Sequence, residues 1–161
     1  MTTTNEPAVV DDETFRVTRT IRIAAPRERV WAALTQEDLI AQWFPQRASL
    51  PDARPGTEGT FTFDGYGDVP VRVDELDEPD VFAYTWGSPG LPLAPDNATQ
   101  VRFTLVADGD ATVLTVVETG FERLADPAGA MRGNREGWTS ELDELVAFVE
   151  AAAVDAGSPA S

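Results

Sequence analysis

The sequence predicts an α+β domain in which a curved antiparallel sheet of about six to seven strands wraps around one long C-terminal helix, with two short helices after the first strand. Most segments before residue 126 alternate apolar and polar residues, which is typical of half-buried strands. Residues 126–153 instead repeat apolar residues at helical spacing. Because one face of each predicted strand is polar, the sheet buries only its other face, and the long helix is the element that can cover it.

The first predicted strand covers residues 15–23, where apolar and polar residues alternate except at Arg19. Pro26 ends this strand and suits the first turn of a helix, where no amide donor is needed. We therefore expect one helix over residues 26–35 and a second short helical piece over residues 36–44.

The middle of the chain predicts further strands separated by turns. The segments with strand patterning are residues 48–50, 57–64, 69–75, 81–86, 99–107 and 111–118. Glycine-containing turns at residues 65–68 and 108–110 indicate hairpins. Residues 87–97 form a long loop with three prolines, and two interpretations stay open for it, a lid over a site or an ordinary connection.

The long helix has a capping signal at its start, since Asp126 can accept hydrogen bonds from the first turn and proline follows it. Acidic side chains such as Glu141 are expected to face mostly away from the sheet. The apolar stripe toward the sheet consists of Trp138, Leu142, Leu145 and Val149, with Met131 and Asn134 on the same line upstream.

Three glycines, Gly129, Gly133 and Gly137, recur every four residues along the first half of this helix. Glycine destabilises a helix by about 1 kcal/mol relative to alanine. Two interpretations stay open: the missing side chains leave room for a ligand or a close strand, or the first turns are simply loose. If the protein has a site, we expect its floor at this half of the helix.

Composition limits the chemistry that the chain can perform. Its 161 residues suit one domain, without a repeat. It has no cysteine, no histidine and no lysine, because all 12 basic residues are arginine. Disulfides, thiolate or histidine metal sites, histidine-dependent triads and Schiff-base chemistry are thereby excluded. No cofactor or metal is expected, and the acidic run at residues 74–80 lacks the ligand pattern of a calcium loop.

The net charge of −16 argues against nucleic acid and anionic membrane surfaces as partners. No apolar run approaches the roughly 20 residues of a membrane span, and the start of the chain lacks a signal-peptide pattern. We therefore expect a cytoplasmic, acidic protein. Its domain is expected over residues 15–154, between flexible tails at residues 1–14 and 155–161.

A combination of motifs in this order resembles the START-like, helix-grip superfamily (the SRPBCC group), and most closely the domains similar to the C-terminal domain of the activator of Hsp90 ATPase. The motifs are IAAPRERVWAALT (23–35), LIAQWF (39–44), TVVETGF (115–121) and REGWTSELDELVAFVE (135–150). The resemblance implies a sheet that grips the long helix with a deep cavity between them. Members of the superfamily bind or transform apolar small molecules, including lipids and polyketide intermediates.

One position departs from the pattern of bacterial relatives, which often carry histidine one helical turn before the Gly-Trp pair. Here that position is Asn134, while Gly137 and Trp138 are retained. Asparagine can orient a ligand by hydrogen bonds, but it cannot transfer a proton at neutral pH.

The predicted ligand-binding residues are aromatic side chains expected to face inward, together with one carboxylate and one amide. They are Trp43, Phe44, Phe61, Phe63, Tyr84, Trp86, Phe103, Glu118, Phe121, Asn134 and Trp138. The alternative for the aromatic residues is core packing. If they line a cavity instead, Tyr84 and the indole N–H groups would supply polar contacts to the ligand. Glu118 either enters the cavity, where desolvation would raise its pKa, or bonds to Arg123 or a backbone amide at the rim. Arg72 and Arg102 are expected on the outer face.

These observations favour a cofactor-free protein that binds an apolar or aromatic small molecule in a cavity of several hundred Å³. Two alternatives stay open. One is a cyclase- or hydrolase-like enzyme that uses Glu118, Tyr84 and water. The other is a chaperone-associated interaction module, by analogy with the family name. Homodimerisation also stays an open alternative.

Overall fold

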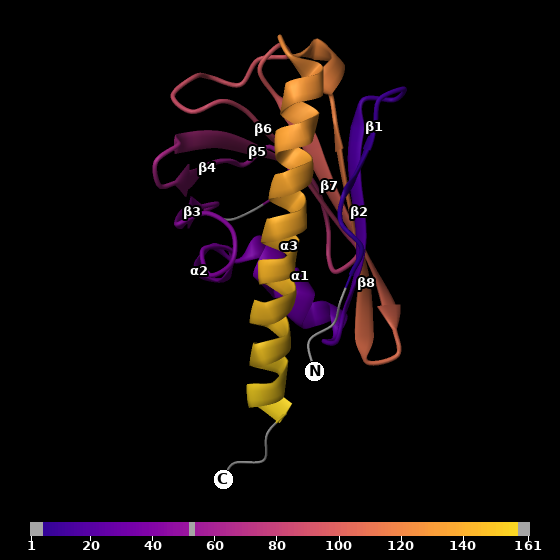
Figure 1. The fold of residues 1–161 in the computed structure, drawn as a ribbon. Coiled ribbons are helices and arrows are strands. Elements are labelled where there is room, and N and C mark those ends of the chain that lie inside the picture. The colour runs from indigo at the N-terminus through magenta and orange to yellow at the C-terminus, as the bar shows by residue number, and fades with distance from the viewer. Residues whose placement is uncertain (1–4, 52–53, 158–161) are drawn as a thin grey trace.

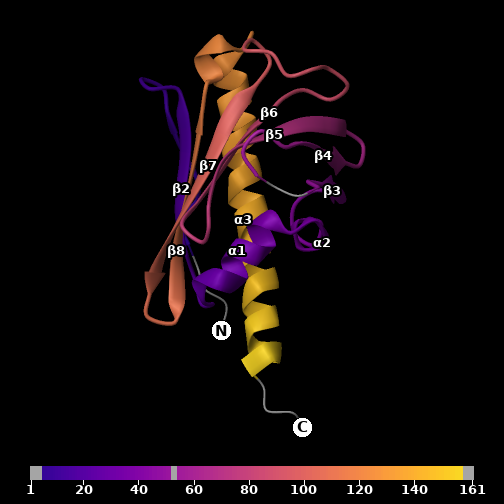
Figure 2. The ribbon, with the colours of Figure 1, turned by 180° about the vertical axis from the view of Figure 1, so that it is seen from behind.

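The computed structural model describes residues 5–51 and 54–157, in which one antiparallel sheet curves around a long helix (Figure 1). The strand order across the sheet is β1-β2-β8-β7-β6-β5-β4-β3. Seen from the opposite side, the strands again enclose the helix, and its C-terminal end extends past them (Figure 2). The predicted fold class is therefore confirmed, with a sheet of eight strands.

Most strand segments agree with the alternation in the sequence to within a few residues. The strands are β1 (Val9–Asp11), β2 (Arg16–Ile23), β3 (Arg47–Ser49), β4 (Glu58–Phe63), β5 (Gly67–Asp77), β6 (Val81–Trp86), β7 (Thr99–Asp108) and β8 (Ala111–Thr119). Strand β5 is longer than its predicted segment at both ends, and it continues into the acidic run at residues 74–80. A register shift between Val73 and Glu75 interrupts the alternation there, which explains why the sequence pattern missed the last two residues of the strand.

The helices cover the concave side of the sheet and one of its ends (Figures 1 and 2). They are α1 (Arg27–Thr35), α2 (Glu37–Ile40), the single-turn η1 (Phe121–Arg123) and α3 (Pro127–Gly157). Within the described residues, no helix is long and apolar enough to cross a membrane. The predicted helix over residues 36–44 is shorter than expected, because residues 41–44 form turns.

Helix α3 begins as the capping signal predicts. The backbone N–H of Gly129 donates to Asp126 Oδ1 over 3.1 Å, and the N–H of Ala130 donates to the carbonyl of Asp126. The predicted apolar stripe faces the sheet and is buried. Burial of large aliphatic and aromatic side chains along this stripe, each contributing about 1.5–3 kcal/mol, holds the helix in the sheet.

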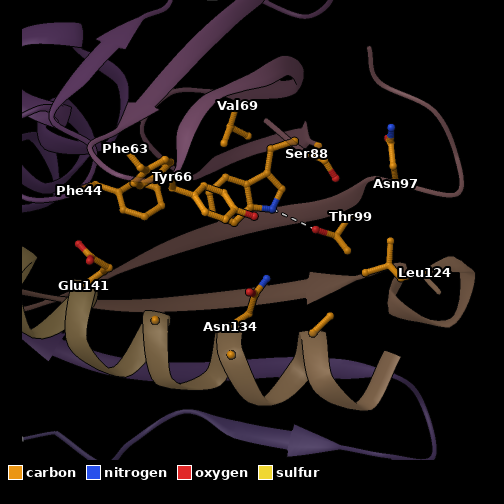
Figure 3. A pocket seen from close by; sticks show the side chains of 15 residues that line it. Phe44, Phe63, Tyr66, Val69, Ser88, Asn97, Thr99, Leu124, Asn134 and Glu141 are labelled. Carbon is orange, nitrogen blue, oxygen red and sulfur yellow. Dashed lines mark hydrogen bonds between the residues drawn. The ribbon is translucent and has the colours of Figure 1, made fainter. Parts of the chain in front are cut away.

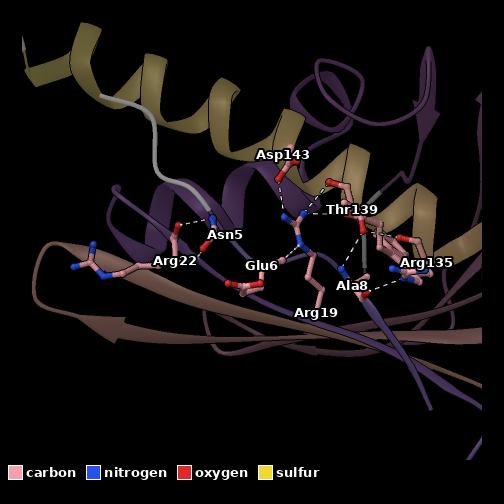
Figure 4. A network of polar contacts seen from close by, with 9 residues as sticks. Asn5, Glu6, Ala8, Arg19, Arg22, Arg135, Thr139 and Asp143 are labelled. Atoms are coloured by element: carbon pink, nitrogen blue, oxygen red, sulfur yellow. Dashed lines mark hydrogen bonds and ion pairs between the residues drawn. The ribbon is translucent and has the colours of Figure 1, made fainter.

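Arg19 breaks the alternation of β2 because it points inward, where its side chain is only 1% exposed. Figure 4 shows its guanidinium reaching α3, where it donates to the carbonyls of Trp138 and Thr139 over 3.2 and 2.8 Å. It also donates to the carbonyl of Glu6 and pairs with Asp143 over 2.7 Å. The buried charge is thus compensated by three carbonyls and one carboxylate, and the acceptors on Trp138, Thr139 and Asp143 join β2 to α3.

The start of the domain lies earlier than predicted. Residues 1–14 were expected to be a flexible tail, but β1 pairs with β2 in register from Val9↔Thr18 to Asp11↔Arg16. Ala8 is buried, and its N–H donates to the hydroxyl of Thr139. Such a short polar segment has too little patterning to predict a strand. At the other end α3 reaches residue 157, while residues 1–4 and 158–161 of the predicted tails lie outside the described part of the chain.

Candidate functional site

A cleft of about 560 Å³ opens beside the first half of α3. Its walls come from this half of the helix, from the β4–β5 hairpin and from the loop that follows β6 (Figure 3). The residues that line it are Phe44, Phe63, Tyr66, Val69, Trp86, Gly87, Ser88, Asn97, Thr99, Leu124, Ala130, Gly133, Asn134, Gly137 and Glu141. This volume lies within the range of small-molecule sites, about 300–1,000 Å³.

One wall of the cleft consists of aromatic rings that contact one another. The Phe44 ring lies 5.3 Å from Phe63 and 5.6 Å from Trp86, measured between ring centroids. Tyr66 extends this wall from the hairpin turn and stands edge-on to Phe63 at 6.4 Å. Rings that pack on each other in this way form a rigid apolar surface.

The opposite wall is the α3 face, and it is open because side chains are missing. A Cβ atom added at Gly133 or Gly137 would meet no atom within 4 Å. At Gly129 the same Cβ would lie 2.2 Å from Asp126 Oδ2, so this glycine belongs to the helix cap. The three evenly spaced glycines therefore have two different causes, and two of the three leave cleft volume empty.

Glu118 lies behind the cleft wall and is 0% exposed. It accepts hydrogen bonds from four side chains. Trp138 Nε1 donates to Oε1 over 2.8 Å, Trp86 Nε1 donates to Oε2 over 2.9 Å, and Asn134 Nδ2 lies 2.9 Å from both oxygens. The hydroxyl of Thr99 donates to Oε2 as well. The inward alternative for this carboxylate is thus the observed one.

Burial raises the pKa of Glu118 because desolvation penalises the charged form, while the four hydrogen bonds act in the opposite direction. Burial and, to a smaller extent, the charge of Glu118 raise the pKa of Tyr84. Arg123, the alternative partner at the rim, instead donates to the carbonyl of Pro95 and pairs with Glu122. Glu118 therefore acts as an acceptor that fixes its donors, three of which line the cleft.

The eleven predicted site residues divide into three groups. Phe44, Phe63, Trp86 and Asn134 line the cleft. Glu118 lies directly behind it. The remaining aromatic residues are buried outside the cleft lining: Trp43, Phe61, Tyr84, Phe103, Phe121 and Trp138. Core packing, the alternative for the aromatic set, is what the structure shows for these six.

The expectation that indole N–H groups would face a ligand is wrong. Trp43 Nε1 donates to the carbonyl of Ala33 over 2.8 Å. The indole N–H groups of Trp86 and Trp138 donate to Glu118. A buried N–H without a partner costs about 1–3 kcal/mol, so these donors are satisfied within the protein.

Glu141 is the main cleft residue that sequence patterning missed, because it was expected to face away from the sheet. It lies two turns after Asn134 on α3 and points toward the cleft (Figure 3). Burial and then the charge of Glu144 raise the pKa of Glu141 to about 6. The helical spacing of Glu141 from Asn134 and Gly137 places the three residues on one face of α3. This spacing is the sequence signal that could have identified Glu141 as a cleft residue.

The loop at residues 87–97 contributes Gly87, Ser88 and Asn97 to the cleft. It is held against the hairpin by a hydrogen bond from the Gly90 N–H to the carbonyl of Asp68. Leu91 in this loop is 53% exposed. These contacts are those of an anchored loop that forms part of the wall, and the lid interpretation stays a prediction.

The outer face of the sheet carries the arginines that were expected there. Arg72 pairs with Asp74, and Arg102 pairs with Glu75, both over 3.1 Å. Among the described residues, no group of three or more acidic side chains could hold a metal ion.

Comparisons with known proteins identify the fold. A family model described as "Activator of Hsp90 ATPase homolog 1-like protein" matches residues 24–150. None of the curated proteins matches significantly. Among solved structures, DynU16, a protein in the dynemicin biosynthetic locus, is 25% identical with a TM-score of 0.72, over 86% of this chain and 48% of DynU16. The chain thus spans about half the length of DynU16.

Two further solved structures have similar folds. Protein MLL2253 from Mesorhizobium loti is 24% identical with a TM-score of 0.70, over 88% of this chain and 99% of its own. CalU16 from Micromonospora echinospora is 25% identical with a TM-score of 0.64, over 85% of this chain and 77% of its own. The START-like helix-grip fold predicted from the motifs is confirmed.

Proposed function

The chain belongs to the Activator of Hsp90 ATPase homolog 1-like family, and from this premise we propose that it binds an apolar or aromatic small molecule in the cleft beside α3. One observation carries the proposal. The α3 wall has two glycines with open space around them, directly opposite an aromatic wall. Glycine destabilises a helix relative to alanine. We therefore interpret its presence at both positions as a requirement for open space in the cleft.

The polar groups of the cleft are few and fixed, as in a binding site. Asn134 donates through Nδ2 to both oxygens of Glu118, which fixes its amide, and its Oδ1 is the atom of this cleft residue that is left to accept from a ligand. Ser88 adds a hydroxyl on the other side. A ligand with an aromatic or fused-ring body and one or two hydrogen-bonding groups fits this arrangement.

Catalysis by Glu118 has less support. A general base must come within about 2.6–3.2 Å of the proton that it removes. Glu118 is fully buried, and Trp86, Thr99 and Asn134 stand between it and the cleft while donating to its oxygens. The cyclase- or hydrolase-like alternative would need another acid or base.

Nile red, an uncharged dye whose fluorescence rises in apolar surroundings, provides the test. Titration of the protein should give saturable fluorescence in the wild type. Gly137→Leu should lower the affinity at least about tenfold, because the new side chain enters the cleft, and it should fold because leucine favours helices. Ser140→Leu, on the exposed surface of the same helix, is the matched control and should bind as the wild type does. Equal affinity in both variants would overturn the proposal.

Association with an Hsp90-type chaperone stays a prediction that rests on the family alone. A pull-down with the purified chaperone tests it, and absence of association at micromolar concentrations would reject it. Homodimerisation is likewise a prediction, which sedimentation of the full chain tests.

A further inference from the structure

The cleft contains one acidic side chain at a defined place. Glu141 is half-buried on the cleft face of α3, two turns from Asn134 and one turn from Gly137 (Figure 3). Seven residues of helix correspond to about 10 Å along its axis. A ligand that reaches Glu141 with one end therefore has its body beside Gly137 and Asn134.

No basic side chain accompanies this carboxylate. The residues that line the cleft include no arginine, and none of the ion pairs within the described ranges involves Glu141. The neighbouring charge is Glu144, which is also acidic and, with burial, raises the pKa of Glu141 to about 6. Without a bound cation, the Glu141 carboxylate is thus partly desolvated and repelled.

The aromatic wall supplies a second attraction for positive charge. Ring faces carry negative partial charge, and cations within about 6 Å of a ring centroid are attracted to them. Phe44, Phe63, Tyr66 and Trp86 form this wall. The net charge of −16 favours cationic ligands over anionic ones at long range.

From this geometry we propose that the ligand is a protonated amine on an aromatic or fused-ring body, with its ammonium group paired to Glu141 and its rings against the aromatic wall. The proposal rests on the proposed function, and it names the chemical class of ligand for that cleft. A neutral ligand would leave the Glu141 carboxylate without a partner, and a carboxylic acid would be repelled by it.

Three compounds with the same ring and attachment position test the proposal: naphthylmethylamine, naphthylmethanol and naphthoic acid. Each is titrated against the full chain at pH 7.5, with displacement of Nile red and calorimetry as the measurements. The amine should bind about tenfold more tightly than the alcohol, the effect of one charge-assisted contact. The acid should bind more weakly than the alcohol.

Glu141→Gln should remove the preference for the amine and leave the affinity for the alcohol unchanged. Glu144→Gln, on the exposed face of α3, is the matched control and should keep the preference, because Glu144 does not line the cleft. If the alcohol or the acid binds as well as the amine, or if Glu141→Gln keeps the preference, the proposal is overturned while the binding function stands. If Nile red does not bind and calorimetry detects binding of none of the three compounds, both proposals fail.

Discussion

The two halves of α3 are one continuous helix with different surroundings. The second half packs Leu142, Leu145, Val146 and Val149 into the core, where each is at most 2% exposed. The first half presents small and polar residues to the cleft, among them Gly133, Asn134, Gly137 and Glu141. The cleft therefore arises from the choice of side chains along a regular helix. One half of the helix stabilises the fold, and the other half provides space and polar groups.

This comparison predicts that stability and binding separate along the helix. Leu145→Ala should lower the free energy of unfolding by about 4 kcal/mol, because it leaves a cavity in the packed half. Urea denaturation measures this loss. Nile red affinity, measured where the variant is folded, should stay at the wild-type value. A parallel loss of affinity would show that the two halves are coupled.

Glu118 joins the two regions, since it is buried like the core and bonded to the cleft wall. Glu118→Met should cost about 3 kcal/mol, because the Trp138 and Asn134 donors lose their acceptor. Glu118→Gln should cost about 1 kcal/mol, since the amide keeps one acceptor oxygen. Chemical denaturation checks both values. Glu122→Gln, at a half-exposed ion pair, is the control and should change stability by less than about 0.5 kcal/mol.

A substitution in the first half of α3, beside the cleft, should change stability in the opposite direction to Leu145→Ala in the second half. Gly137→Ala should stabilise the protein by about 1 kcal/mol, because alanine is the better helix former and its methyl group meets open space. The same change should weaken Nile red binding, since it reduces the cleft. Gly129→Ala should destabilise the protein, because its Cβ would clash with the Asp126 cap. Thermal unfolding of both variants distinguishes the two roles.

The smallest expected effect is a pH dependence in the cleft half. The pKa of Glu141 is raised from 4.5 to about 6 by burial and by Glu144. A carboxyl group with a raised pKa contributes stability below pH 4.5, and this contribution is lost as the pH rises through 6. The Tm of Glu141→Gln should therefore match the wild type near pH 4 and exceed it at pH 7. A constant Tm difference across this range would contradict the assignment.

Part of the site could be predicted, because Asn134 and Gly137 lie on a helix whose faces follow from residue spacing. The same reasoning did not separate Phe44 and Phe63, which line the cleft, from Phe61 and Tyr84, which are buried. All four are aromatic side chains that lie within predicted strands or helices. Their division depends on which ring is covered by a distant segment, and no local pattern records that.

The sequence by itself determined strands β2 to β8, the long helix, its Asp126 cap and the absence of histidine, cysteine and lysine chemistry. These features follow from neighbouring residues and from composition. Only the tertiary structure decided that Glu118 meets Trp86, Thr99 and Asn134, which are up to 32 residues away in the chain. It also decided that the N-terminal segment pairs with β2. Such contacts depend on how segments distant in the sequence pack, because burial and hydrogen bonding are properties of the assembled fold.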